Sequence, residues 1–308
     1  MGRRKKGDPV SGWVIVDKPV GPGSTNVVSM VRRLYNAQKA GHAGTLDPLA
    51  SGILPVALGE ATKTVPYILD ASKGYRFTIR FGASTATDDL EGEVTATSDH
   101  RPGKADILAA LPAFTGEILQ TPPIYSAIKV DGERAYDLAR AGEEVVLKAR
   151  PVTIHNIELL GMPDADHAEL EISCSKGTYV RSLGRDLALK LGTLGHIVAL
   201  RRIAHGPFRE EGAIPLDKLA GLGHIPPASQ TLWTHLLPIE TALDDIPALA
   251  LSSDDAARIR RGQGVLLRGR DAPIFVGAVL VTHRGDPVAL TEYVRGELRP
   301  LRVFNLGS

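Results

Sequence analysis

The chain has 308 residues, which at roughly 150 residues per domain indicates about two domains and excludes a peptide, a disulfide-stapled miniprotein or a lone zinc finger. Its 36 Lys and Arg residues almost balance 35 Asp and Glu residues, so a nucleic-acid partner has to be argued from where the charge lies and not from the total. The single cysteine, Cys174, excludes an internal disulfide and favours a reducing compartment, so we expect a cytoplasmic protein.

The N-terminus carries four consecutive cations, Arg3 to Lys6, which are followed by Gly, Asp and Pro and not by an apolar segment. This pattern excludes a signal peptide and predicts a flexible basic arm over residues 1–10. The longest stretch without a charged residue, 219–239, contains three prolines and two histidines, so it suits a linker better than a membrane helix. We therefore expect no membrane partner.

The first predicted elements are a strand over residues 12–16 and a helix that begins at Ser24. Ser24 is a plausible N-cap, and the helix has one apolar face made of Val27, Val28, Val31, Leu34 and Tyr35. A loop rich in glycine and polar residues follows over 41–52, and the apolar run 53–58 predicts a buried strand.

Residues 75–81 alternate between apolar or aromatic and polar side chains, which predicts a half-buried strand. Similar patterns predict strands over 93–97, 117–120, 152–160, 168–175 and 196–201, with helices over 107–111, 133–140 and 179–191. Because the helices do not alternate regularly with the strands, the expected fold class is α+β, built around a mixed or antiparallel central sheet with flanking helices.

The chain changes character after Phe208. A proline-rich stretch over 225–247 predicts a connector, and strands are expected over 262–267, 275–281, 287–290 and 301–305. Residues 250–308 contain nine Arg, no Lys and six acidic residues, a net charge of +3. Arginine as the only cation suits contact with phosphate or RNA, although an ordinary solvated surface explains the charge equally well.

Several cofactor motifs are missing from the sequence. Asn26 stands where a dinucleotide fingerprint beginning at Gly21 needs its third glycine, and no Walker motif occurs. The nine histidines are scattered and not set at ligand spacing, so neither a nucleotide cofactor nor a catalytic metal is expected. Cys174 lies in a strand pattern and is better interpreted as a small buried hydrophobe than as a nucleophile.

Two polar segments are candidates for chemistry. Asp47 precedes a proline, which restricts its backbone, and its loop also carries His42, so Asp47 suits a presented nucleophile or base, although Asp-Pro alone more often starts a turn. The segment 174–183 places Tyr179 and Arg181 at the start of a helix, where anions are favoured. Residues 173–210 carry seven cations and two acidic residues, which makes them a basic island in a neutral chain.

The loop sequence Gly-His-Ala-Gly-Thr-Leu-Asp-Pro-Leu-Ala-Ser-Gly over 41–52 resembles the active-site motif of TruB-type tRNA pseudouridine synthases, bacterial form, residue for residue. The resemblance extends in order from about residue 12 to 208, through the segments Val-Asp-Lys-Pro (16–19), Lys-Gly-Tyr (73–75), Pro-Pro-Ile-Tyr-Ser-Ala (122–127), Gly-Thr-Tyr-Val-Arg (177–181) and Leu-Arg-Arg (200–202). The tail resembles a small PUA-like RNA-binding module on the weaker ground of its strand and glycine pattern.

The resemblance implies a central sheet of the pseudouridine synthase type in a catalytic domain over 11–245, with an RNA-clasping insertion over 121–152 and a PUA-like domain over 246–308. It implies isomerisation of the uridine at position 55 in the tRNA T-loop, with the tRNA T-stem-loop as partner. It also implies no cofactor, no metal and a monomer that works without a guide RNA.

Site residues follow by the same resemblance. Asp47 would be the nucleophilic carboxylate, attacking either ribose C1′ or uracil C6, a choice that the sequence leaves open. Arg181 would pair with Asp47, and Tyr75 would stack on the uracil near C5. The substrate-binding residues would be Tyr179 and Leu200, which line the pocket, His42, which fills the place of the flipped base, and Lys63, which with Lys18 and Pro19 supports the floor of the site.

Two alternative functions remain at the level of sequence. A tRNA-binding folding factor would grip the T-loop without essential chemistry. A T-loop uridine methyltransferase would need a nucleophilic cysteine and a methyl-donor fold, whereas the chain offers only Cys174 and no glycine-rich cofactor loop.

Overall fold

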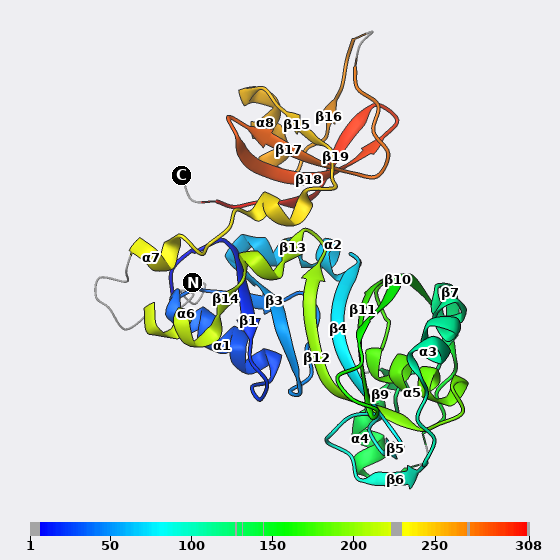
Figure 1. Cartoon of the computed structure of the whole chain (residues 1–308). Coiled ribbons are helices and arrows are strands. Elements are labelled where there is room, and N and C mark those ends of the chain that lie inside the picture. The colour runs from blue at the N-terminus through cyan, green and yellow to red at the C-terminus, as the bar shows by residue number, and fades with distance from the viewer. Residues whose placement is uncertain are drawn as a thin grey trace.

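A computed structural model describes residues 7–126, 128–130, 132–143, 145–222, 230–269 and 272–306. Within them the larger body is built on a ten-stranded sheet of order β14-β1-β3-β12-β4-β11-β10-β7, with β2 added to β3 and β13 to β12 (Figure 1). The pairs β1–β14 and β3–β12 are parallel and the other pairs are antiparallel, so the predicted mixed α+β architecture is confirmed. The strands are β1 Gly12–Lys18, β2 Ala40–His42, β3 Ala50–Leu58, β4 Lys73–Phe81, β7 Gly116–Gln120, β10 Arg150–Gly161, β11 His167–Cys174, β12 Gly195–His205, β13 Phe208–Arg209 and β14 Ile214–Pro215.

Strand β4 shows how the alternating pattern forms the sheet. Tyr75, Phe77 and the following alternate apolar residues are buried on one face, while Arg76 and Arg80 are exposed on the other. β4 lies between β12 and β11 and pairs with both over most of its length, so its inward side chains stand at the middle of the sheet.

Helices cover one face of this sheet in two groups that flank its centre. The helices α3 and α5 pack on the β4, β11 and β10 side, and α1, α6 and α7 pack on the β1 and β3 side. Leu200 on β12 contacts both groups, so the two apolar cores meet there. The bounds are α1 Ser24–Leu34, α3 Lys104–Ala110, α5 Val180–Lys190, α6 Leu216–Leu222 and α7 Gln230–Trp233, with the short helices α2 Val65–Leu69, α4 Ala135–Arg140, η1 Gly59–Lys63, η2 Leu111–Phe114 and η3 Glu210–Gly212.

Two small hairpins extend from the edge of the larger body. One pairs β5 Ala83–Thr85 with β6 Val94–Thr97, and the other pairs β8 Lys129–Val130 with β9 Glu133–Arg134. Both lie beside α4 at one end of the molecule (Figure 1). The second hairpin and α4 belong to the segment 121–152.

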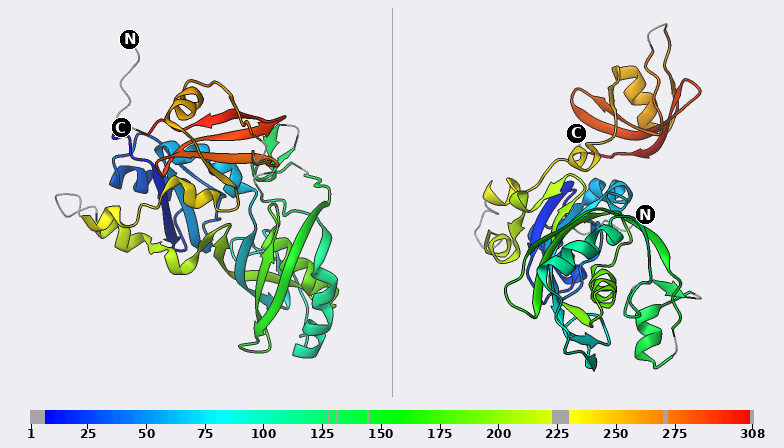
Figure 2. Two further views of the ribbon diagram at one scale, coloured as in Figure 1. Left: turned by 90° about the horizontal axis from the view of Figure 1, so that it is seen from above. Right: turned by 45° about the vertical axis from the view of Figure 1, so that its right-hand side comes forward.

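A second unit at the C-terminus packs on the opposite side of β1 and β3, where it shares a core with these strands, with α2 and with η4 Ile239–Leu243. A five-stranded sheet of order β15-β17-β18-β19-β16 curls around helix α8 and sits apart from the helical layer (Figures 1 and 2). Leu280, Leu290 and Phe304 of this unit share one core with Trp13 of β1 and with η4. The bounds are β15 Ala248–Ala250, α8 Ser253–Arg260, β16 Val265–Leu266, β17 Ala278–His283, β18 Asp286–Val294 and β19 Glu297–Val303.

Several local predictions are wrong. Ser24 is the first residue of α1 and Gly23 is its N-cap, because the Ser24 hydroxyl is engaged by the backbone of Leu46. The 41–52 loop begins inside strand β2 and ends inside β3. The helix predicted from residue 133 begins at Ala135, since the two preceding residues pair in β9.

The stretch 225–247 is not a simple connector. Residues 225–229 lie outside the described residues, but α7 and η4 bury Leu232, Ile239 and Leu243 against the two units. Apolar side chains between the prolines therefore anchor the stretch. In the C-terminal unit the strand predicted over 262–267 is limited to β16, and α8 was not predicted.

Among the described residues, no helix has both the length and the apolar character needed to span a bilayer.

Candidate active site

The loop that carries Asp47 is fixed to its surroundings at three points. The Ser24 hydroxyl hydrogen-bonds both the backbone N–H and the carbonyl of Leu46, each at 2.9 Å. The Pro48 carbonyl accepts from the Gly21 N–H at 2.8 Å and from the Lys18 ammonium at 3.4 Å. These bonds hold the residues on either side of Asp47, while its own side chain stays 47% exposed.

Arg181, in the first turn of α5, lies between two carboxylates. Its guanidinium is 3.0 Å from Asp47 Oδ2 and 3.2 Å from Asp89 Oδ2. It also donates to the carbonyls of Thr87 and Tyr125 at 3.1 and 3.0 Å. The Arg181 side chain is only 10% exposed, so the Asp47 carboxylate is oriented by a cation that is itself immobilised.

Asp89 is a site residue that the sequence reasoning missed. It is buried, accepts from the Thr87 hydroxyl and from the Glu91 N–H at 3.0 Å, and its backbone forms a parallel bridge with Ile197 of β12. Local sequence gave no signal for it, because two adjacent aspartates before a Glu-Gly-Glu segment are typical of a solvated loop.

A small pocket opens where the Asp47 loop meets β12 and α5. It brings together Asp47, Arg181 and Leu200, as the resemblance implied, and adds Asp89. Its other lining residues are apolar: Leu49, Ala50, Ile197, Val198 and Ala199. A half-exposed carboxylate at the mouth of an apolar pocket can attack a carbon centre from which water is excluded.

The two tyrosines of the prediction lie close enough to Asp47 to be affected by its charge, although neither is among the residues that line the pocket. Tyr75 on β4 is buried and lies opposite Arg202 of β12. Burial raises the pKa of Tyr75, the nearby Asp47 charge raises it further, and the charge of Arg202 opposes the rise. Tyr179 is the N-cap of α5, and its N–H donates to Gln120 Oε1 at 2.8 Å. Burial also raises the pKa of Tyr179, so both phenols are protonated at neutral pH.

His42 lies on β2, beneath the loop. Burial and the charge of Arg202 lower its pKa, so the imidazole is neutral at pH 7. Its Nδ1 is buried and has no hydrogen-bond partner among the described residues. Lys18 is fully buried and donates to the carbonyls of Pro19, Pro22 and Pro48, so it supports the loop from below.

Lys63 is not brought to the pocket. It lies in η1, where its ammonium contacts Glu60 Oε2 at 2.5 Å and donates to the Val303 carbonyl of β19 at 2.7 Å. The residue therefore lies at the junction with the C-terminal unit.

Cys174 is fully buried, and burial raises its pKa to about 11, so it is a protonated thiol at neutral pH and unsuited to nucleophilic attack. Among the described residues, no group of three His, Cys, Asp or Glu side chains is placed to hold a metal ion.

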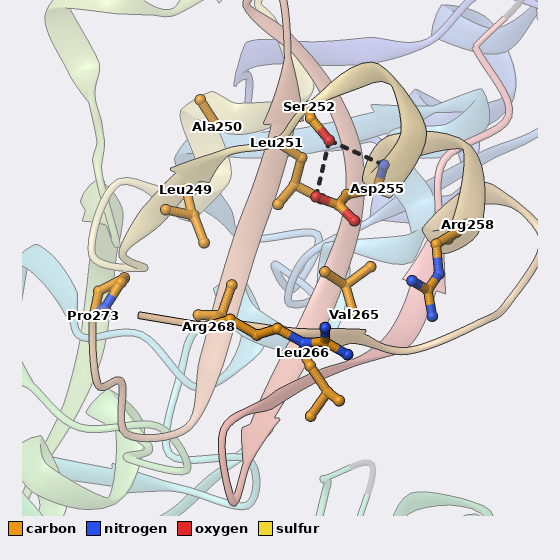
Figure 3. Close-up of a pocket in the computed structure, with 11 residues that line it drawn as sticks. Leu249, Ala250, Leu251, Ser252, Asp255, Arg258, Val265, Leu266, Arg268 and Pro273 are labelled. Carbon is orange, nitrogen blue, oxygen red and sulfur yellow. Dashed lines mark hydrogen bonds between the residues drawn. The ribbon is translucent and has the colours of Figure 1, made fainter. Parts of the chain in front are cut away.

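A larger pocket lies in the C-terminal unit and shares no lining residue with the pocket at Asp47 (Figure 3). It is lined on one side by residues of β15 and the start of α8, and on the other by β16 and the loop after it. Arg258 and Arg268 contribute guanidinium groups to its wall, and Ser252 caps α8 by accepting from the Asp255 N–H at 3.2 Å (Figure 3). Its apolar walls and two cations suit a nucleotide.

Comparison with known families and proteins bears on this site. The family described as "TruB family pseudouridylate synthase (N terminal domain)" matches residues 32–180, and "tRNA pseudouridylate synthase B C-terminal domain" matches residues 181–244. A tRNA pseudouridine synthase B from Bradyrhizobium diazoefficiens is 59% identical over 99% of this chain and 88% of its own. One from Brucella anthropi is 52% identical over the full length of both chains.

Solved structures resemble the whole chain. A chain of a Cbf5-Nop10-Gar1 complex has 27% identity and a TM-score of 0.74, covering 95% of this chain and 84% of its own. A chain of an H/ACA RNP bound to a substrate RNA containing 2′-deoxyuridine has 24% identity and a TM-score of 0.75, covering 99% and 91%. The likeness extends across both the central sheet and the C-terminal unit.

Proposed function

The chain belongs to the TruB family of pseudouridylate synthases and isomerises uridine in tRNA, and we propose that it acts at position 55 of the T-loop with Asp47 as its nucleophile. The observation that carries the proposal is the ion pair of 3.0 Å between Asp47 and the buried Arg181, at the mouth of an apolar pocket. The curated relatives favour isomerisation over a folding factor or a methyltransferase, and a protonated, buried Cys174 does not suit the latter.

The proposed chemistry needs no co-reactant. Asp47 attacks ribose C1′ or uracil C6, and the bond between N1 and C1′ breaks while the uracil stays in the pocket. The base turns, C5 bonds to C1′, the carboxylate is released, and the proton on C5 is lost as N1 gains one. Product and substrate are isomers, so the reaction is balanced within the nucleoside. Holding base and sugar together in a closed pocket replaces a bimolecular encounter.

Substrate binding in this proposal depends on base flipping, because the target bond lies inside a folded loop. Tyr75 stacks on the flipped uracil near C5, and Tyr179 and Leu200 form the walls of the pocket. His42, neutral at pH 7, occupies the place the base has left. Stacking on an aromatic ring contributes about 1–3 kcal/mol per base, enough to offset much of the cost of flipping.

The RNA-binding surface of the proposal reaches beyond the pocket. The insertion 121–152 closes over the T-arm; it lies close to the site, since the Tyr125 carbonyl accepts from Arg181 and the Thr121 carbonyl from Ser182 at 2.8 Å. The unit 246–308 acts as a PUA-like RNA-binding domain, supported by its net positive charge and by the Arg258 and Arg268 pocket. The active unit is a monomer with the catalytic domain at 11–245.

Release of tritium from RNA labelled at uridine C5 tests the proposal. The purified chain, without added cofactor, is mixed with a T-arm stem-loop and with the same stem-loop carrying cytidine at position 55 and labelled uridines elsewhere. We expect one equivalent of tritium from the first RNA and none from the second. Release from the cytidine variant contradicts the assignment to position 55, and no release from either contradicts the function.

A further inference from the structure

The proposed chemistry leaves one buried arginine without a role. Arg202 on β12 is 1% exposed and is among the largest fully buried side chains of the protein. No carboxylate of the described residues forms an ion pair with it, and the Tyr75 phenol is the one group whose charge would support its cationic form. Burying a cation without a carboxylate partner costs free energy of folding, which indicates that its hydrogen bonds serve a function.

The guanidinium of Arg202 connects the two halves of the site. Nη2 donates to the carbonyl of Gly44 at 3.1 Å, three residues before Asp47 on the same loop. Nε donates to the Ile53 carbonyl of β3 at 2.8 Å, and the guanidinium lies beside Tyr75, which is opposite Arg202 in the pairing of β12 with β4. One planar group thus links the loop of the carboxylate to the phenol and fastens both to the sheet.

Two glycines of the 41–52 motif make room for this arginine. A Cβ at Gly52 would lie 2.2 Å from the Arg202 carbonyl oxygen, and one at Gly44 would lie 3.3 Å from Arg202 Nη1. Both glycines also have positive φ, +98° and +81°. In the sheet register Arg202 lies opposite Gly52 on one side and opposite Tyr75 on the other. The loop and the arginine therefore fit each other closely.

We propose that Arg202 is a positioning residue for pseudouridine formation, in which its guanidinium sets the Tyr75 hydroxyl at a fixed place relative to the Asp47 loop. The proposal rests on the proposed function, since it assigns Tyr75 to the face of the uracil. Lysine cannot replace Arg202 fully, because an ammonium lacks the planar fork that reaches acceptors in different directions.

The charged groups around Arg202 are consistent with this role. Four other groups lie near it: Lys18 from β1, His42 from β2, Lys73 from β4 and His205 from β12. Burial lowers the pKa of each and the charge of Arg202 lowers it further, and the resulting pKa is about 8 for Lys73 and about 2 for His205. Tyr75 faces Arg202, Asp47 and Cys174. Arg202 lowers the pKa of Tyr75 against the burial that raises it, so removing the guanidinium raises that pKa.

The test compares Arg202 with its neighbour Arg201. Arg201 points to the other face, where it forms ion pairs with Asp17 and Glu210 at 2.9 Å. Single-turnover tritium release at saturating T-arm RNA is measured from pH 6 to 10 for Arg202→Lys, Arg202→Met, Arg201→Lys and Arg201→Met. We expect Arg202→Met to slow release about 100-fold with RNA affinity within about twofold of wild type, Arg202→Lys to be intermediate, and both Arg201 variants to stay within about threefold.

A second measurement separates positioning from a purely structural role. Tyrosinate absorbance is titrated in the wild type and in each Arg202 variant, and the curve of the matching Tyr75→Phe protein is subtracted. We expect the titration midpoint of Tyr75 to rise in Arg202→Met and to rise less in Arg202→Lys. The lysine variant remains informative if the methionine variant does not fold.

Wild-type release rates in both Arg202 variants overturn the proposal, as does an unshifted Tyr75 titration. The proposal is also overturned if Arg201→Met loses as much rate as Arg202→Met when the two variants have lost the same thermal stability. Failure of the proposed function is distinguishable, because the wild type would then release no tritium while the Tyr75 titration would still report the contact with Arg202.

Discussion

Replacing Asp89 by asparagine tests whether the second carboxylate beside Arg181 serves the chemistry. Asp89→Asn keeps the size of the side chain and an oxygen for the Thr87 hydroxyl and the Glu91 N–H, but it removes the charge that faces Arg181 at 3.2 Å. The Arg181 guanidinium then depends on Asp47 and on two carbonyls.

The size of the expected loss of stability follows from the burial of the two side chains. The side chains of Arg181 and Asp89 are 10% and 8% exposed, and removing one partner of a buried ion pair costs about 3–5 kcal/mol. Because Arg181 keeps three other acceptors, we expect the free energy of unfolding to fall by about 3 kcal/mol, the lower end of that range. A displacement of Arg181 by about 1 Å moves Asp47 with it, which costs about 100-fold in rate. Asp89 is buried, so RNA affinity should not change.

The assay pairs urea unfolding with single-turnover tritium release at saturating RNA, and Asp88→Asn is the control. Asp88 is the preceding residue, but it pairs with Arg185 at 2.8 Å and not with Arg181. Asp88→Asn should lose stability and keep its rate within about threefold, whereas Asp89→Asn should lose both. Equal rates in the two variants, or a wild-type rate in Asp89→Asn, would refute the reasoning.

Three further predictions follow from other parts of the molecule. Burial lowers the pKa of His205 to about 2 in the folded protein, against an ordinary value of 6.5, so the unfolded chain binds a proton at a higher pH than the folded protein does. The free energy of unfolding therefore falls as the pH drops below 6.5, by about 2 kcal/mol at pH 5. The urea midpoint of His205→Gln should fall less between pH 7 and pH 5 than that of the wild type, and an equal fall contradicts the assignment. The double change Arg258→Gln and Arg268→Gln should weaken tRNA binding and reduce the salt slope by about two without slowing release at saturating RNA, and an unchanged slope argues against the C-terminal pocket as an RNA site. Lys63→Met should lower the free energy of unfolding by about 1 kcal/mol, because it removes the bonds from the ammonium to Glu60 and to the Val303 carbonyl, and an unchanged urea midpoint would contradict this.

Local patterns predicted the parts of the fold that depend on neighbouring residues. The alternation over 75–81 is enough to identify β4, because one face of that strand is buried and the other is solvated. The 41–52 motif identified Asp47 and, through the resemblance, its pairing with Arg181, although these residues are far apart in sequence.

Features that depend on contacts between residues far apart in the chain could not be predicted from the sequence. Asp89 matters only because its backbone pairs with Ile197 and its carboxylate meets Arg181, and no local pattern records either contact. Ser24 looks like an N-cap until Leu46 is placed beside it. Likewise, the sequence predicts that Ile239 and Leu243 belong to a proline-rich connector, whereas packing between the two units buries them.

The most direct test of the central claim is the single-turnover reaction of Asp47→Asn with labelled T-arm RNA, measured beside its affinity for the same RNA. Asparagine fits the same space and can still accept a hydrogen bond from Arg181, but it has no carboxylate to attack a carbon. The account predicts no detectable tritium release and a dissociation constant close to that of the wild type, with Asp70→Asn, an exposed carboxylate paired with Lys176, fully active as the control. Release by Asp47→Asn at a rate near the wild type would contradict Asp47 as the nucleophile.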